Sequence, residues 1–306
     1  MQKSGLVLIG GGSGFIGTQL QKTLRKKNYD VIVVSRKPGN HRISWGDLSK
    51  SGLPKGTTAV VNLAGQNVLD PMRRWSPGFK QNVWASRVNT TKSLSKAILE
   101  AEKKPKVFVS QSGVGFYPPS ETTVYTEASS GGSGNFIAEL AKDWESAAQL
   151  PPESGVRNVI IRSGVVLGRQ GGMIKQLYPV FYLGGGGPIG SGRQYFPWIH
   201  VQDCVNLFTH AIENDKVSGV INGVAPHIIT NAEFSKCFGR AMWRPAFVPL
   251  PEFAVNTIFG PDRAIMMLEG QKVVPEKALE FGFEFKFPTI DKACEEMAPL
   301  LHRESD

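Results

Sequence analysis

The chain has 306 residues, of which 41% are hydrophobic, and it carries a formal net charge of +9. This length allows one large domain with a substantial core and a smaller appended domain. No run of about 18 uncharged apolar residues occurs, which argues against a membrane span. The basic residues come in short scattered groups without interleaved aromatic residues, so we expect no nucleic-acid partner.

Three cysteines, Cys204, Cys237 and Cys294, lie far apart in the sequence and form no CxxC pair. An odd number of cysteines with such spacing predicts a reducing intracellular compartment and no metal site. The first apolar strand begins at Leu6, which leaves no room for a leader in the chain as given. We therefore expect the cytoplasm, with the mitochondrion as the alternative if the precursor is longer.

Short apolar runs alternate with helical patterns through the first half of the chain. We expect buried strands at 6–9, 31–34, 59–63, 107–110 and 159–162, and crossover helices at 86–100 and 136–150. This alternation predicts an α/β fold, namely a doubly wound parallel sheet of the NAD(P)-binding Rossmann type with right-handed connections.

The pattern changes after about residue 170 to Gly/Pro-rich loops, short strands and helices. Thr230 and Glu233 have the spacing of a capping box, and further helices are expected at 253–259, 264–269 and 291–300. We predict a nucleotide-binding domain over 1–170, to which later segments return, and a mixed α/β cap over 171–306. Such a cap lies on the substrate side, because ligands bind at the carboxyl ends of strands in open α/β sheets.

Glycines at Gly11, Gly14 and Gly17 follow the first strand and precede a helix that opens with Phe15 and Ile16. The first glycine allows a tight turn, the second lets the backbone approach a pyrophosphate, and the third lets the helix lie close to the strand. The pyrophosphate then binds free N–H groups at the positive end of the helix. These five residues are therefore predicted to bind a dinucleotide.

The second strand ends in Ser35-Arg36-Lys37 and carries no acidic residue there. An NAD site carries Asp or Glu at this place to bind the ribose 2′-hydroxyl. Ser35 and Arg36 can instead hydrogen-bond and neutralise a 2′-phosphate, since the planar guanidinium matches phosphate oxygens. The predicted cofactor is NADP(H), although a solvated basic loop is the plainer reading of these residues.

Several motifs in order extend the comparison over nearly the whole chain. They are GGGSGFIG, SRKPG, VVNLAG, RRW, SRVNTT, RSGVVLG, GGPIGSGRQYFPWIHVQD, NGVAPHIITNAEF and the C-terminal stretch from RPAFVPLP to FGFEFKFP. Together they resemble the epimerase-family proteins of family 39U, among the atypical extended short-chain dehydrogenase/reductases, with their characteristic C-terminal domain.

The resemblance implies further roles in the cofactor site. It implies that Ser35 and Arg36 bind the 2′-phosphate and that Leu63 and Ala64 pack beside the adenine ribose. It also implies that Asn82 and Arg87, on the helix after RRW, contact the cofactor or support the active site, and that Val165, in a loop after Arg162, meets the nicotinamide carboxamide. Leu63, Ala64 and Val165 equally fit core positions, and Arg87 equally fits a surface ion pair.

The chain lacks the Tyr and Lys, four residues apart on one helix, that active members of the wider superfamily use for proton transfer. None of its six tyrosines is followed by Lys at the fourth position. If Glu145 matches the family's helix glutamate, Ile137 and Ala141 stand at the two sites. Lys142 is one residue out of register, which is about 100° around a helix.

Ser112, just after the strand 107–110, matches the superfamily's catalytic serine, and Tyr117 and Tyr125 are the nearby phenols. We predict these three as catalytic residues, with Tyr117 or Tyr125 as the substitute acid or base. The alternative for Ser112 is a strand-end hydroxyl that bonds the backbone.

Three functions remain open at this level. The preferred one is an NADP(H)-dependent oxidoreductase that acts on a small anionic or polar substrate. The second is a catalytically silent NADP(H)-binding protein that senses redox state or assists assembly, and the third is a nucleotide-sugar epimerase with a rebuilt site. We expect a monomer or homodimer whose partners are the nucleotide cofactor and a small-molecule substrate.

Overall fold

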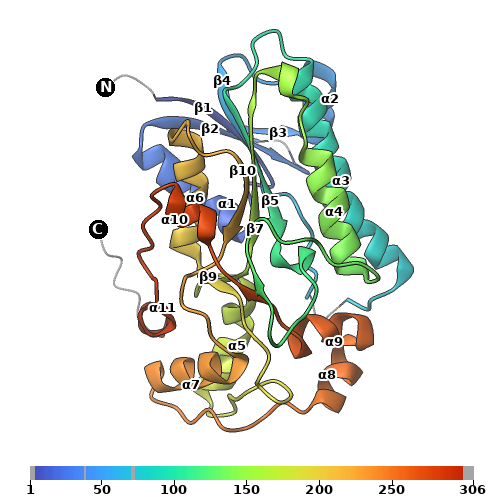
Figure 1. Cartoon of the computed structure of the whole chain (residues 1–306). Coiled ribbons are helices and arrows are strands. Elements are labelled where there is room, and N and C mark those ends of the chain that lie inside the picture. The colour runs from blue at the N-terminus through green and yellow to red at the C-terminus, as the bar shows by residue number, and fades with distance from the viewer. Residues whose placement is uncertain (1–3, 38, 70–72, 299–306) are drawn as a thin grey trace.

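Seven parallel strands form a central sheet in the order β10-β7-β5-β4-β1-β2-β3 (Figure 1). The computed structural model describes residues 4–37, 39–69 and 73–298. The strands are β1 (Gly5–Gly10), β2 (Tyr29–Ser35), β3 (Arg42–Ser44), β4 (Thr57–Asn62), β5 (Val107–Gly113), β7 (Arg157–Ser163) and β10 (Gly219–Gly223). The chain order reverses between β1 and β4, which is the switch point where ligands bind in sheets of this kind.

Helices cover both faces of the sheet. One face carries α1 (Phe15–Lys26) and α6 (Val201–Glu213), and the other carries α2 (Trp45–Ser51), α3 (Pro77–Leu99) and α4 (Phe136–Ala148). The predicted doubly wound Rossmann fold is therefore confirmed. Because both faces are covered, the middle of the central strands is a continuous apolar run, and polar residues such as Ser112 and Arg162 come toward their carboxyl ends.

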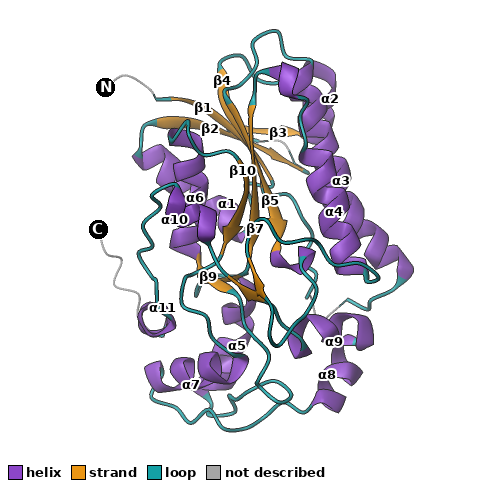
Figure 2. Ribbon diagram, viewed as in Figure 1, coloured by secondary structure: helices purple, strands orange, loops and turns teal. Residues whose placement is uncertain are grey.

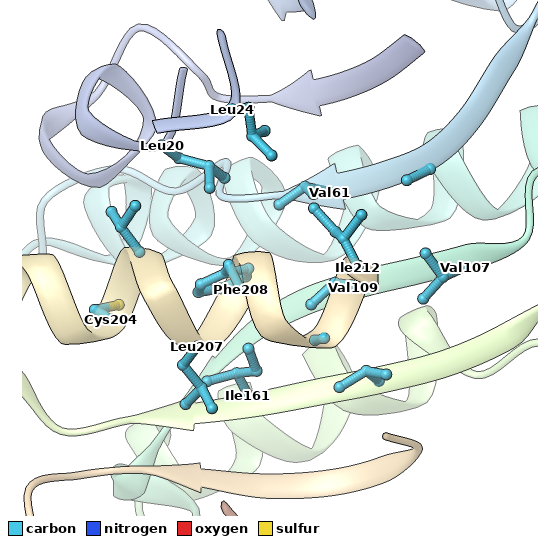
Figure 3. Packing of buried hydrophobic residues seen from close by; sticks show 14 of the residues in the cluster. Leu20, Leu24, Val61, Val107, Val109, Ile161, Cys204, Leu207, Phe208 and Ile212 are labelled. Carbon is cyan, nitrogen blue, oxygen red and sulfur yellow. The ribbon is translucent and has the colours of Figure 1, made fainter. Parts of the chain in front are cut away.

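Each face of the sheet has a hydrophobic core beneath its helices, and the alternation of side chains along the strands supplies both cores. Val107 and Val109 point toward α6, where they pack with Phe208 and Ile212 (Figure 3), whereas Phe108 belongs to the core beneath α3 and α4. Successive side chains of a strand point to opposite faces, so one apolar run supplies both cores.

A cap lies at the carboxyl ends of the central strands, in the lower half of Figure 2. It contains α5 (Gly172–Tyr182), α7 (Asn231–Ala241), α8 (Glu252–Phe259), α9 (Pro261–Leu268) and α11 (Ile290–Met297), and α5, α7 and α11 share a core of their own. The smaller elements are β6 (Val124–Tyr125) paired with β11 (Lys272–Val273), β8 (Val165–Leu167) paired with β9 (Trp198–His200), α10 (Glu276–Glu280), and the 3₁₀ turns Val114–Phe116 and Pro152–Ser154.

Several element boundaries differ from the sequence prediction. α3 begins at Pro77 and not at residue 86, because the Ser76 hydroxyl accepts from the Phe79 N–H at 3.2 Å and proline is favoured in a first turn. α9 likewise begins at Pro261 rather than 264. The predicted last helix ends at Met297, and residues 299–300 of that prediction lie outside the described residues.

Two further outcomes concern the cap and the short elements. The capping box of Thr230 and Glu233 is present at the start of α7. β3 and α2 were not predicted, since each is too short for a periodic signal. After residue 170, β10 is a strand of the main sheet and α6 packs on one face of it, while the division at residue 170 itself stays an interpretation.

Asp203 joins the C-terminal segment to the first turn of α6. It is fully buried, and its two carboxylate oxygens accept from the backbone N–H groups of Lys286 and Phe287, each at 2.8 Å. Burial raises the pKa of this carboxyl, against the opposing effect of the two bonds. Truncation of the side chain leaves two buried donors without an acceptor.

We predict that Asp203→Ala lowers the free energy of unfolding by about 2–5 kcal/mol, because each unsatisfied buried donor costs on the order of 1–3 kcal/mol. Urea denaturation followed by circular dichroism measures the change. Asp215→Ala is the control, since Asp215 is exposed and its contact with Arg157 spans 3.5 Å, so its loss changes stability by less than about 1 kcal/mol. Equal stability of the two variants would contradict the anchoring role.

Candidate functional site

The glycine turn after β1 is shaped by two tight backbone contacts and one open position. Gly11 has φ +73°, and a Cβ there would lie 2.6 Å from the backbone of Ala64. A Cβ at Gly17 would lie 2.5 Å from the carbonyl oxygen of Gly12. At Gly14 the nearest atom to a Cβ is the Gly11 oxygen at 3.4 Å, and within 4 Å of that Cβ the described residues place no side chain.

The first backbone N–H groups of α1 point toward the open position at Gly14. Gly14 caps the helix without a side-chain bond, and the first turn contains no acidic residue. The first N–H groups of a helix have no partner inside the helix, and they attract anions. The Phe15 ring packs on the turn at Gly168 and Gly171, and Ile16 packs on the core, so both residues face the space with their backbone.

Ser35 and Arg36 lie beside this turn, where the Gly11 N–H donates to the carbonyl of Val34. Ser35 is buried, and its hydroxyl donates to the carbonyl of Lys37 at 2.6 Å. Arg36 is exposed, and among the residues described no carboxylate forms an ion pair with it. A free guanidinium thus stands next to the open turn.

The end of β4 closes the other side of the turn. The Leu63 N–H donates to the Gly10 carbonyl, and the Ala64 N–H donates to Asn62 Oδ1 at 3.1 Å. Asn62 is fully buried, and its amide also donates to the Thr91 hydroxyl at 2.6 Å. Asn62 therefore shapes the strand end, which the apolar pattern of the sequence did not indicate.

Arg87 reaches this strand end from α3. A Cβ at Gly65 would lie 3.0 Å from its Cζ, and the guanidinium lies 5.2 Å from the ring centroid of Trp144. Burial lowers the pKa of Arg87 to about 10, with no carboxylate among the described residues to offset it. The indole N–H of Trp144 is buried, and the described residues offer it no acceptor. Asn82, earlier on α3, is exposed.

Ser112 belongs to a buried polar network at the carboxyl ends of β5 and β7. It lies inside β5 and not after it, and its hydroxyl donates to Glu145 Oε1 at 2.8 Å. The two carboxylate oxygens of Glu145 accept from Arg162 Nε and Nη2, both at 2.8 Å. Arg162 Nη1 in turn donates to the Tyr117 hydroxyl at 2.9 Å.

The hydroxyl of Tyr117 has two more partners, the carbonyl of Thr126 at 3.0 Å and Asn222 Oδ1 at 2.8 Å. Only 1% of Tyr117 is exposed, and burial raises the pKa of its hydroxyl despite the neighbouring Arg162. Tyr125 is also buried and stacks on Tyr117 with ring centroids 5.1 Å apart. The predicted roles of both phenols as proton donors stay predictions.

The position expected for the catalytic tyrosine is apolar. Ile137, in the first turn of α4, packs so closely on Gly115 that a Cβ there would lie 2.5 Å from Ile137 Cγ2. Val165 begins the short strand β8, where a loop was expected, and its N–H donates to the Pro197 carbonyl at 2.8 Å. Its side chain is partly buried.

Arg162, Asn222 and Glu127 were not predicted as parts of the site. The sequence did contain a signal for Arg162, since it directly follows the apolar run 159–161. A charged residue in a buried strand needs a partner, so its position indicates a buried polar contact. Asn222 and Glu127 gave no such signal. Glu127 is buried, and its Oε1 accepts from the backbone N–H groups of Asn222 and Lys277, so its role follows from tertiary contacts alone.

Among the residues described, no group of three or more His, Cys, Asp or Glu side chains could hold a metal ion. Burial raises the pKa of the Cys204 thiol to about 12 and that of Cys237 to about 11, and the described cysteines are free thiols. None of the described helices combines the length and the apolar character needed to cross a bilayer.

Two family profiles match the chain. The profile of the NAD dependent epimerase/dehydratase family matches residues 7–222, and that of a domain of unknown function, DUF1731, matches residues 250–297. The first match covers the central sheet through β10, and the second covers α8 to α11. The resemblance predicted from the motifs is therefore confirmed.

Individual relatives agree. The epimerase family protein SDR39U1 from Homo sapiens is 50% identical over 291 residues, which cover 95% of this chain and 99% of the relative. The epimerase family protein YfhF from Bacillus subtilis is 31% identical over 297 residues, covering 94% of this chain and 96% of the relative.

Solved structures extend the comparison to the fold. The crystal structure of human SDR39U1 (isoform 2) with NADPH has a TM-score of 0.95 and 51% identity, and covers 97% of this chain and 100% of that one. The crystal structure of a nucleoside-diphosphate sugar epimerase from Corynebacterium glutamicum has a TM-score of 0.76 and 28% identity, and the match covers 96% of this chain and 58% of that one. The chain therefore belongs to the NAD dependent epimerase/dehydratase family, among the epimerase family proteins related to SDR39U1.

Proposed function

We propose that this protein is an NADP(H)-dependent oxidoreductase of the short-chain dehydrogenase/reductase type that acts without the usual Tyr–Lys pair. The observation that carries the proposal is the open position at Gly14 beside the guanidinium of Arg36, for which the described part of the chain provides no carboxylate partner. The crystal structure of the human relative with NADPH supports the choice of cofactor.

The cofactor site is proposed to extend along the carboxyl edge of the sheet. The backbone of Gly11, Gly14, Phe15, Ile16 and Gly17 would hold the pyrophosphate. The N–H groups of Gly11 and Gly14 are bonded within the turn, to the carbonyls of Val34 and Gly11, whereas those that follow Gly14 begin the helix without a partner inside it. Ser35 and Arg36 would bind the 2′-phosphate. Arg87 is suited to a cofactor oxygen anion, since its buried charge has no carboxylate partner among the residues described.

Three further contacts rest on position. Leu63 and Ala64 are suited to the adenine ribose because they border the same turn as Gly11. Asn82 is exposed on α3 and free to turn toward a ligand, and Val165 is partly exposed where β8 follows β7. These assignments follow the family resemblance.

Bound NADPH supplies a hydride to an electrophilic carbon. The chain's own residues must then hold the substrate oxygen and deliver a proton to it. Ser112 can donate a hydrogen bond to that oxygen only if its hydroxyl turns away from Glu145. The single proton of the Tyr117 hydroxyl is donated to the Thr126 carbonyl or to Asn222 Oδ1, and Arg162 donates to the same oxygen. Delivery of that proton to a substrate therefore requires a local rearrangement.

A catalytically silent NADP(H)-binding protein is the second candidate, and two observations favour it. Ile137 occupies the expected tyrosine position with an apolar side chain, and the Tyr117 hydroxyl is fully engaged inside the protein. A protein that only binds the cofactor needs no proton donor. Such a sensor must bind the reduced and oxidised cofactors with different affinities or in different conformations.

Arg36→Ala should weaken NADPH binding about 10- to 100-fold, because a charge-assisted hydrogen bond contributes about 1.5–3 kcal/mol. NADH binding should change little, since NADH has no 2′-phosphate. Isothermal titration calorimetry with both cofactors measures the difference. Arg193→Ala, at an exposed arginine of the cap, is the control and should alter neither affinity. Equal weakening of both cofactors by Arg36→Ala would refute the assignment.

Gly14→Val should abolish NADPH binding while the chain stays folded. The backbone at Gly14 has φ −79° and ψ −179°, which valine adopts easily, and its Cβ would meet only the Gly11 oxygen at 3.4 Å. The added methyl groups then occupy the space of the pyrophosphate. Gly78→Val, at an open position on α3, is the control. Fluorescence titration and circular dichroism measure binding and folding, and tight binding by Gly14→Val would exclude this turn as the site.

Ser112→Ala, Tyr117→Phe and Tyr125→Phe separate the two candidate functions. If the protein is an enzyme, Ser112→Ala and one of the Tyr→Phe variants should each lower turnover by ~10²-fold or more at unchanged NADPH affinity. NADPH oxidation over a panel of carbonyl compounds is the assay. Turnover that survives all three changes would remove the catalytic assignment.

The same three variants should be without effect on cofactor binding if the protein is a sensor. NADPH and NADP⁺ should then differ in affinity or in the hydrogen exchange of the cap. Equal affinity and identical exchange for the two cofactors would exclude the sensor. The melting temperature of each variant controls for loss of the buried network.

A further inference from the structure

The segment that matches the domain of unknown function reaches the loop between β4 and α3 through one buried side chain. Arg263, on α9, is only 1% exposed. Its Nη2 donates to the carbonyl of Arg73 at 2.8 Å and its Nη1 to the carbonyl of Val68 at 3.4 Å. Its Nε donates to the carbonyl of Phe259, at the end of α8, at 3.0 Å. The guanidinium of Arg263 thus bonds two positions of the loop and the end of α8, the helix before α9.

Aromatic rings enclose this guanidinium. Its Cζ lies 5.6 Å from the ring centroid of Trp75, near the end of the loop, and 5.5 Å from that of Phe259. A buried guanidinium is stable only where its donors find acceptors in its own plane and its faces meet apolar or aromatic groups. The carbonyls of the loop meet that requirement only in the observed loop conformation.

A second contact joins the neighbouring residue to the far end of the loop. Asp262 accepts from Lys80 Nζ, in the first turns of α3, at 2.6 Å. Gly260, with φ +78°, makes the sharp junction between α8 and α9 that lets Asp262 and Arg263 both face the loop. In Figure 1, α8 and α9 lie beside the lower end of α3.

The loop that Arg263 bonds is the continuation of Leu63 and Ala64, the residues proposed to border the adenine ribose. Its other contacts include the Gln66 N–H bond to the Ser86 hydroxyl at 3.0 Å and the Leu69 N–H bond to Asn67 within the loop itself. A loop without anchors must be ordered when a ligand binds, and this entropy cost lowers affinity.

We propose that Arg263 is a positioning residue that orders the described parts of the β4–α3 loop, residues 63–69 and 73–76, for cofactor binding, so that the C-terminal domain of unknown function completes the NADP(H) site. This role rests on the proposed function. It assigns to the C-terminal domain a task in the cofactor site even though its helices follow the last strand of the main sheet.

The test compares the full-length protein with Arg263→Lys. An ammonium group keeps the charge but cannot bond three carbonyls in one plane. We expect NADPH to bind about 10-fold more weakly, measured by calorimetry, because the loop must then be ordered on binding. Hydrogen exchange in the described residues 63–69 and 73–76 of the free protein should become faster, while exchange in α1 stays unchanged.

Two controls separate positioning from stability. Arg240→Lys changes an arginine of the same cap that is paired with the exposed Asp291, and it should alter neither NADPH affinity nor loop exchange. Asp203→Asn weakens a buried anchor elsewhere, and it should lower the melting temperature without lowering NADPH affinity. If Arg263→Lys does not fold, Asp262→Asn tests the same loop from a partly exposed position and should weaken NADPH about 2- to 3-fold.

The outcomes are distinct. The positioning role alone would be overturned if the wild-type protein binds NADPH normally and the Arg263→Lys and Asp262→Asn variants bind it with the same affinity. Loop exchange that is unchanged in Arg263→Lys would do the same. Failure of the wild-type protein to bind NADPH would overturn the proposed function and the positioning role together.

Discussion

The buried ion pair between Arg162 on β7 and Glu145 on α4 is the interaction on which the carboxyl edge of the sheet depends. Both bonds measure 2.8 Å, and the guanidinium also lies 3.4 Å from the ring centroid of Phe116. Removal of one partner of a buried pair costs about 3–5 kcal/mol, because the remaining charge is left without compensation. The pair therefore holds β7, α4 and the 3₁₀ turn after β5 in one arrangement.

This arrangement constrains the chemistry available to the site. Ser112 and Tyr117, the two residues most suited to a reaction by their position, both bond members of the pair. Their hydroxyls thus stabilise the resting protein, and a catalytic use of either one has to compete with that role. The apolar Ile137 offers no substitute, so the balance between enzyme and silent binder depends on how readily this network rearranges.

The C-terminal segment is part of the same network. The Asn222 amide donates to the carbonyl of Val274 at 3.0 Å, and the amide of Gln271 donates to the carbonyl of Tyr117 at 3.2 Å. Glu127 bonds the backbone of Lys277, and β11 pairs with β6 next to Tyr125. Because the segment contacts the Rossmann core at so many polar points, its removal would expose buried donors and acceptors of the nucleotide-binding half.

The alternation of the longer strands and helices in the first half, the glycine turn, the missing Tyr–Lys pair and the family resemblance followed from the sequence by itself. Each depends on residues that are neighbours along the chain or repeat with the period of a helix or strand. The boundaries of the helices were predicted less accurately. The expected start of α3 was residue 86, whereas the helix begins at Pro77, before its apolar stripe. The tertiary structure alone decided the partners of Arg162, Asn222 and Arg263. Apart from the bond of Arg263 to Phe259, four positions away, those contacts join residues separated by 17 to 195 positions. No local pattern records which distant carboxylate, hydroxyl or carbonyl will satisfy a buried donor.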